Sequence, residues 1–138
     1  MSRVRLPAIM ALLLGSAMVR ADIAVVTHDA SHAVHLSRHQ VINIFMGRYR
    51  QLPDGGLALP IDLVGLKDRF YRALVDRDLA EINALRARQV FSGQGSPPYQ
   101  ADAPEEVAAL VLQNPGALGY VDAAGVTPDQ QIVFMLHE

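Results

Sequence analysis

The 138-residue sequence contains no cysteine. This absence excludes disulfide bonds, thiolate catalysis and cysteine-ligated metal sites, and it argues against a lipid anchor, because no lipobox cysteine follows the first apolar segment. The sequence also lacks a Walker loop, a paired-carboxylate motif and a G-x-S-x-G nucleophile elbow. No catalytic motif therefore supports an enzyme, and a non-enzymatic role is expected.

One long apolar run, from Leu6 to Val19, lies near the N-terminus. Arg3 and Arg5 precede the run, and Val19-Arg20-Ala21 fits the small-x-small pattern of a signal-peptidase site. The run is shorter than the ~20 apolar residues that a membrane-spanning helix needs. These features predict a signal peptide over residues 1–21 that is cleaved before Asp22, and hence a periplasmic protein.

Positive charge is scarce in the predicted mature domain, residues 22–138. Removal of residues 1–21 takes away three of the 12 Lys and Arg and none of the 14 Asp and Glu, which leaves a net charge of −5. A nucleic-acid surface needs clustered positive charge, so this partner class is excluded. A small anion stays possible, because backbone N–H groups and one arginine can bind it within an acidic protein.

Strand and helix signals alternate along the mature domain. Apolar, β-branched segments predict strands at Ile23–Val26, Leu57–Val64, Leu118–Asp122 and Ile132–Leu136. Capping residues and apolar periodicity predict helices opened by Ser37, Lys67, Asp78 and Pro104, with Gly47 as the left-handed residue that ends the first. Strands separated by helices predict an α/β fold with a mixed β-sheet flanked by helices.

Four segments share a pattern with one protein family. They are Ile44-Phe45-Met46-Gly47-Arg48 with the following Asp54-Gly55, Arg69-Phe70-Tyr71, the V-F-S-G-Q-G-S-P-P stretch over 90–98, and the P-G-A-L-G-Y-V stretch over 115–121. Together they resemble the PstS-like family, the phosphate-type substrate-binding proteins of ABC transporters. The resemblance implies a single periplasmic-binding-protein-like lobe, a small oxyanion such as phosphate as ligand, no cofactor, and a membrane transporter or sensor as partner.

Two departures from the family pattern bear on its ligand. Full-length phosphate receptors hold the anion between two lobes, whereas this chain is long enough for one. The family grips the anion with a loop that resembles R-x-D-x-S-G-T, and here its place is taken by residues 63–69, L-V-G-L-K-D-R. The serine and threonine hydroxyl donors are missing. An alternative role follows, in which the lobe has lost ligand transport and serves as a periplasmic accessory or sensory interaction protein.

The candidate ligand-binding residues are those at the predicted helix start after the second strand, namely Gly65, Leu66, Lys67, Asp68 and Arg69. A helix N-terminus offers free N–H groups and the positive end of the helix dipole, and Lys67 and Arg69 would add charge. A simpler interpretation is that both cations are solvated and that Asp68 caps the helix.

Four histidines, His28, His32, His35 and His39, are spaced by four, three and four residues. On one continuous helix they would share a face and could hold a metal. Ser37 opens a helix after His35, however, which places the first three in a loop. No metal site is therefore expected.

Two further groups of residues have competing interpretations. Arg48, Tyr49 and Arg50 form a basic-aromatic cluster that could contact an anionic ligand or partner, or could be a solvated connector. The aromatic side chains are expected to build the hydrophobic core rather than a stacking platform; they are Phe45, Phe70, Tyr71, Phe91 and Tyr120.

Overall fold

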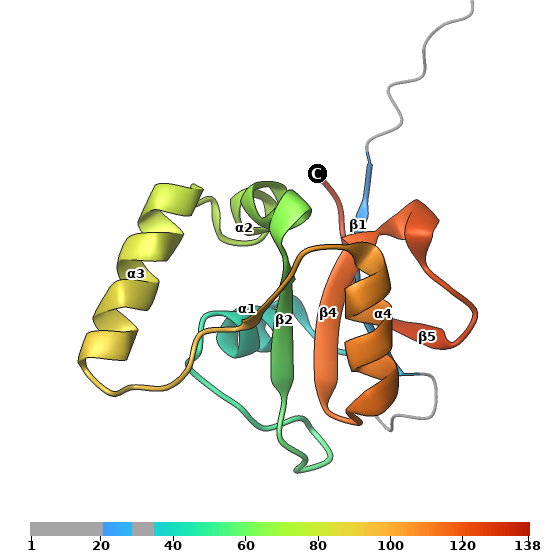
Figure 1. Cartoon of the computed structure of the whole chain (residues 1–138), viewed down its shortest axis with the longest axis horizontal. Helices are drawn as coiled ribbons and strands as arrows, with labels where there is room; N and C mark the ends of the chain where they lie inside the picture. The colour runs from blue at the N-terminus through green and yellow to red at the C-terminus, as the bar shows by residue number, and fades with distance from the viewer. Residues whose placement is uncertain (1–20, 29–34) are drawn as a thin grey trace, which may run out of the picture.

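The computed structural model describes residues 21–28 and 35–138 (Figure 1). Its strands are β1 Ile23–His28, β2 Leu59–Leu63, β3 Tyr99–Ala101, β4 Ala117–Asp122 and β5 Gln130–Leu136. Its helices are α1 Arg38–Phe45, α2 Lys67–Val75, α3 Leu79–Phe91 and α4 Pro104–Gln113, with the 3-10 turns η1 Val64–Leu66 and η2 Ala123–Gly125. Within the described residues, no helix is long and apolar enough to cross a membrane.

The five strands form one mixed sheet in the order β3-β2-β4-β1-β5. Strand β2 runs parallel to β3 and β4, and β1 runs antiparallel to β4 and β5. The predicted α/β class and mixed sheet are confirmed. The short strand β3 was not expected, because three residues after a Pro-Pro pair carry little strand signal of their own.

Helices cover both faces of the sheet (Figure 1). Helix α4 lies on one face, where a Cβ added at Gly119 of β4 would come within 2.5 Å of the Val107 side chain. The other face packs against α1 and α2. There the Phe70 and Tyr120 rings stack with centroids 3.7 Å apart, and Phe45 meets Phe70 edge-on at 5.0 Å. These buried rings are the aromatic core that the sequence predicts.

The predicted helix boundaries are confirmed where capping chemistry defines them. The Ser37 hydroxyl accepts from the Gln40 N–H at 3.1 Å, and the Gln40 side chain accepts from the Ser37 N–H at 2.8 Å, which completes a capping box. Gly47 has a φ of 75°, the left-handed conformation expected after α1. Asp78 caps α3, and Pro104 lies in the first turn of α4.

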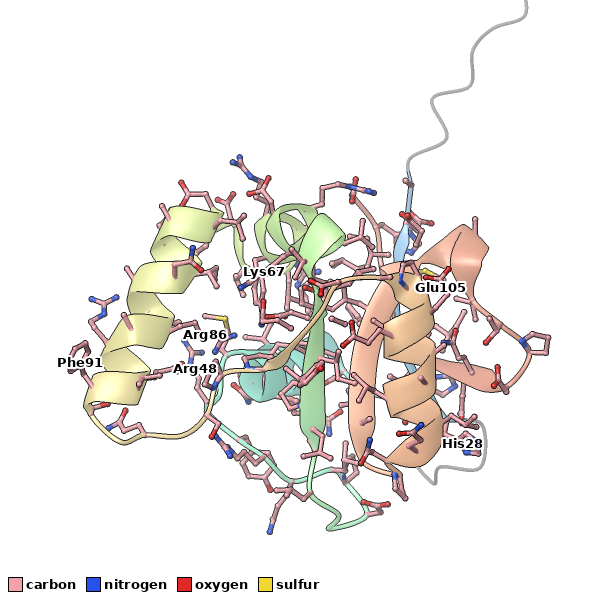
Figure 2. The ribbon with its side chains drawn as sticks, viewed as in Figure 1. His28, Arg48, Lys67, Arg86, Phe91 and Glu105 are labelled. Carbon is pink, nitrogen blue, oxygen red and sulfur yellow. The ribbon has the colours of Figure 1, made fainter. Side chains whose placement is uncertain are left out.

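Two expectations about single residues are wrong. Phe91 is not in the core: its side chain is 94% exposed at the end of α3 and points outward in Figure 2. Helix α3 packs mainly against α2 and buries only Ile82 and Arg86, so its last residue lies beyond the core. His28 is not in a loop, because backbone pairing with Gln130 makes it the last residue of β1.

The P-G-A-L-G-Y-V segment has a packing explanation. A Cβ at Gly116 would collide with the backbone carbonyl of Leu57, and a Cβ at Gly119 would collide with Val107 of α4. Both positions therefore require glycine so that the loop before β2 and the helix α4 can lie close to β4. The segment places Tyr120 on the opposite face, among the aromatic rings.

Candidate functional site

The first turn of the helical segment after β2 is built from η1 and α2. The sequence analysis places the free N–H groups at about Lys67, but the structure begins the helical turn three residues earlier, at Val64. The Lys67 N–H already donates to the Val64 carbonyl. The first-turn donors are thus the N–H groups of Val64, Gly65 and Leu66, and no side chain caps η1 or α2.

Lys67 lies beside this turn but turns its ammonium group toward the sheet (Figure 2). Its Nζ donates to Gln100 Oε1 at 3.0 Å and lies 3.9 Å from Asp62 Oδ2. The Lys67 side chain is only 14% exposed, and that of Asp62 is fully buried. The Asp62 carboxylate therefore partly neutralises the positive charge of Lys67, so this charge is not fully available at the helix start.

Arg69 and Asp68 point away from the turn. Arg69 forms an ion pair with Glu138 at 2.7 Å, and it lies 3.6 Å from Asp122. The hydrogen bond to Glu138 raises the pKa of Arg69. Asp68 pairs with Arg72 at 2.8 Å along the helix surface and does not cap α2, whose N-cap is Leu66. The structure thus brings together Gly65, Leu66 and Lys67 and separates the other two side chains.

A buried polar cluster is centred on Asp62 of β2 and is connected to the turn through Lys67. Its Oδ1 accepts from the Tyr71 hydroxyl at 2.8 Å and from the Tyr120 hydroxyl at 3.1 Å, while its Oδ2 accepts from the Gln100 amide at 2.9 Å. Burial, followed by the charge of Asp62, raises the pKa of both tyrosines well above the ordinary value. Both hydroxyls therefore stay protonated and act as donors to the carboxylate.

Arg86 extends the cluster to α3. Its Nη2 donates to the Tyr71 hydroxyl at 3.0 Å and to the Phe45 carbonyl, and its guanidinium carbon lies 5.8 Å from the centre of the Tyr71 ring. Figure 2 shows Arg86 between α3 and the sheet. The buried Nε makes no hydrogen bond to the described residues. The chain Arg86–Tyr71–Asp62 links α3, α2 and β2 through polar contacts inside the core.

The sequence analysis missed Asp62, Arg86 and Gln100. Asp62 alternates with Ile61 and Leu63, which is the pattern of a strand with one solvated face. Because β2 lies between two parallel neighbours under helices on both faces, its polar position is buried instead. One signal was available: a carboxylate within an apolar segment of a predicted α/β sheet has to be paired if both faces are covered.

The described histidines do not converge. His28 ends β1, His35 precedes α1, and His39 lies in its first turn, while His32 lies outside the described residues. Within the part of the chain that the structure describes, no group of three or more His, Cys, Asp or Glu residues could hold a metal ion.

No family model and no curated protein sequence matches the chain. Solved structures do match. A phosphate ABC transporter substrate-binding protein of Clostridium perfringens, with bound phosphate, aligns with a TM-score of 0.64 and 19% identity over 82% of this chain and 45% of its own. An ABC-type phosphate transport receptor of Vibrio cholerae aligns with a TM-score of 0.54 and 14% identity over 82% of this chain and 46% of its own.

The fold is that of a single periplasmic-binding-protein-like lobe. At these identities the likeness shows the fold alone, and the chain spans less than half the length of either matched protein. The expected PstS-like architecture is confirmed to that extent. The matched proteins are named as a phosphate ABC transporter substrate-binding protein and a phosphate transport receptor, and the chain shares the fold of less than half of each.

Proposed function

We propose that this chain is an exported, non-catalytic solute-binding-type domain that binds a small oxyanion such as phosphate weakly. The observation that carries the proposal is the structural match of 82% of the chain to 45% of a phosphate ABC transporter substrate-binding protein with bound phosphate. A predicted signal peptide over 1–21 supports export to the periplasm. Sequencing the N-terminus of the periplasmic protein tests the export: Asp22 is the expected first residue, and a retained Met1 would contradict it.

The anion would bind at the N–H groups of Val64, Gly65 and Leu66, beside Lys67. These donors lie at the C-terminal end of β2, where ligands of open α/β sheets bind. Two features make the binding weak. A single lobe leaves the anion exposed to water. The charge of Lys67 is also partly neutralised by Asp62, which lies 3.9 Å away.

A substitution pair at Gly65 tests this location. Gly65→Pro removes one N–H donor, whereas Gly65→Ala keeps it, and a Cβ at Gly65 meets nothing within 4 Å. Thermal-shift titrations with phosphate, sulfate and molybdate should show a stabilising anion for wild type and Gly65→Ala, and a loss of that effect in Gly65→Pro. Equal stabilisation of both variants would show that the anion binds somewhere other than η1.

Lys67 and Arg69 provide a second comparison. Lys67→Ala should weaken anion binding, because it removes the positive charge of the residue that directly follows the turn. Arg69→Ala removes a longer-range positive charge and should weaken binding less. Arg77→Ala, whose guanidinium pairs with Glu81 on α3 at 3.3 Å, is the control and should leave binding unchanged. Equal losses in all three variants would indicate a non-specific charge effect.

The exposed end of α3 favours the alternative role as an interaction protein. Val90 is 58% exposed and Phe91 94% exposed, side by side on a helix that contacts the rest of the fold mainly through α2. A photocrosslinker placed at Phe91 in cells should then capture one membrane transporter or sensor, whereas a crosslinker at Leu112 of α4, which is 54% exposed, should not. Identical crosslinking from both positions would contradict a specific contact.

A further inference from the structure

A groove opens at the end of β2 opposite to the Asp62 cluster. It encloses about 360 Å³ between the end of α1, the start of β2, the segment before β3 and the C-terminal half of α4. Strand β2 pairs with β3 only from Ile61 onward, and before β2 the backbone pairs at the isolated Gln51–Leu57 bridge. The groove lies between these two pairings, away from the turn proposed to bind the oxyanion.

The groove walls are apolar side chains that solvent reaches. Tyr49, Leu57, Leu59 and Tyr99 all line the groove and are 42–58% exposed. Small-molecule sites are typically concave and mostly apolar, with a few polar groups that fix the ligand's orientation, and they enclose roughly 300–1,000 Å³. The volume of this groove is at the low end of that range, which suits a ligand of modest size.

Arg50 supplies the charge in the groove. Among the described residues that line it, Arg50 is the one charged side chain, and no carboxylate of the described chain forms an ion pair with it. Its Nη2 donates to the Ser96 carbonyl at 3.2 Å, which holds the guanidinium at the wall. A guanidinium has five N–H donors, so others are available to an anionic group in the groove.

We propose that this groove binds a small amphipathic carboxylate, with its carboxylate group on Arg50 and its apolar body against Leu57, Leu59 and Tyr99. The positive charge selects an anion, and the apolar walls select a ligand with a hydrocarbon body. An inorganic oxyanion has no such body, so this ligand class differs from the one proposed at Gly65. The inference stands independently of the oxyanion site.

The charge preference is tested with three matched probes, octanoate, 1-octanol and octylamine. Each is titrated calorimetrically into the mature protein below the concentration at which it forms micelles or separates from water. Octanoate should bind more tightly than 1-octanol, and octylamine most weakly. Arg50→Gln should weaken octanoate about tenfold, the size expected for the loss of a charge-assisted hydrogen bond. Arg88→Gln, an exposed arginine of α3 outside the groove, should leave octanoate affinity unchanged. Equal binding of octanoate and octylamine would overturn the proposal.

The location is tested with a second matched pair. Leu57→Asp places a negative charge in the groove and should abolish octanoate binding, whereas Leu112→Asp, at an equally exposed leucine of α4, should not. Saturating phosphate should leave octanoate affinity unchanged, and competition between the two would overturn the separation of the sites. A dimer in sedimentation that Leu57→Asp disrupts would assign the groove to a second copy of the chain and also overturn the proposal.

Discussion

The two ends of β2 differ in how their side chains are satisfied. At the C-terminal end, the buried carboxylate of Asp62 accepts hydrogen bonds from Tyr71, Tyr120 and Gln100. At the N-terminal end, Leu57 and Leu59 face an open apolar groove. A buried charge is tolerated only with a full set of partners. The Asp62 cluster at the C-terminal end of β2 is therefore expected to stabilise the fold, next to the turn proposed to bind the oxyanion. Exposed leucines contribute little to folding, and Leu57 and Leu59 line the groove that we propose as a carboxylate site.

The largest effect is expected when Asp62 is changed. Asp62→Ala leaves two buried tyrosine hydroxyls without their acceptor and Lys67 without its carboxylate. The free energy of unfolding should fall by about 3 kcal/mol or more, as it does when one partner of a buried polar network is removed. Asp68→Ala, which breaks an exposed pair with Arg72, should have little effect. Urea denaturation of both variants measures the difference, and equal stabilities would show that the Asp62 cluster is not required for folding.

Gly119 of β4 lies beside the middle of β2, where α4 packs on the sheet. Gly119→Ala places a methyl group 2.5 Å from a Val107 carbon, and overpacking of this kind typically costs about 1–3 kcal/mol. Gly125→Ala is the control, because a Cβ there meets nothing within 4 Å. Thermal unfolding should rank Gly119→Ala clearly below Gly125→Ala. The reverse order would mean that α4 can move away from the sheet without loss.

Gly47 lies on the groove and ends α1 in the left-handed region. Gly47→Val should lower the free energy of unfolding by more than ~1 kcal/mol, because a β-branched residue resists a φ of 75°. Gly47→Asn should lower it less, since asparagine enters the left-handed region more readily. Denaturation midpoints of the two variants measure this difference; an unchanged midpoint in Gly47→Val would contradict the role of Gly47 as the helix end.

The smallest effects are expected for the exposed groove leucines. Leu57→Ala and Leu59→Ala should each change the free energy of unfolding by less than about 0.5 kcal/mol, the usual range for surface positions. Leu118→Ala, fully buried on β4, should cost about 2–5 kcal/mol. A large loss at Leu57 or Leu59 would show that the groove wall is part of the core, and it would remove the contrast between the two ends of β2.

Local chemistry made much of the fold predictable. Ser37, Asp78 and Pro104 mark helix starts because their contacts lie within one helical turn, and Gly47 marks a helix end through its own backbone conformation. The mixed sheet followed from strands separated by helices. Strand β3 did not, since Tyr99–Ala101 becomes a strand only by pairing with β2, whose partner residues are far away in the sequence.

The candidate site was harder to predict, because its geometry depends on tertiary contacts. The turn at Gly65 was found, but the directions of Lys67 and Arg69 are set by Asp62 and Glu138, and nothing local specifies these pairings. Phe91 was expected in the core because it is aromatic and helical. Its exposure follows from the position of α3 at the side of the molecule (Figure 1).

Calorimetric titration of phosphate into a protein of residues 22–138, at low and at high salt, tests the central claim most directly. A single open lobe with one partly neutralised lysine should bind weakly, with a dissociation constant above the micromolar range, and salt should weaken it further because exposed charges are screened. Submicromolar binding that salt does not change would contradict the account, since it would require a second lobe or a second copy of the chain to enclose the anion. The absence of any binding at millimolar phosphate would contradict the oxyanion site itself.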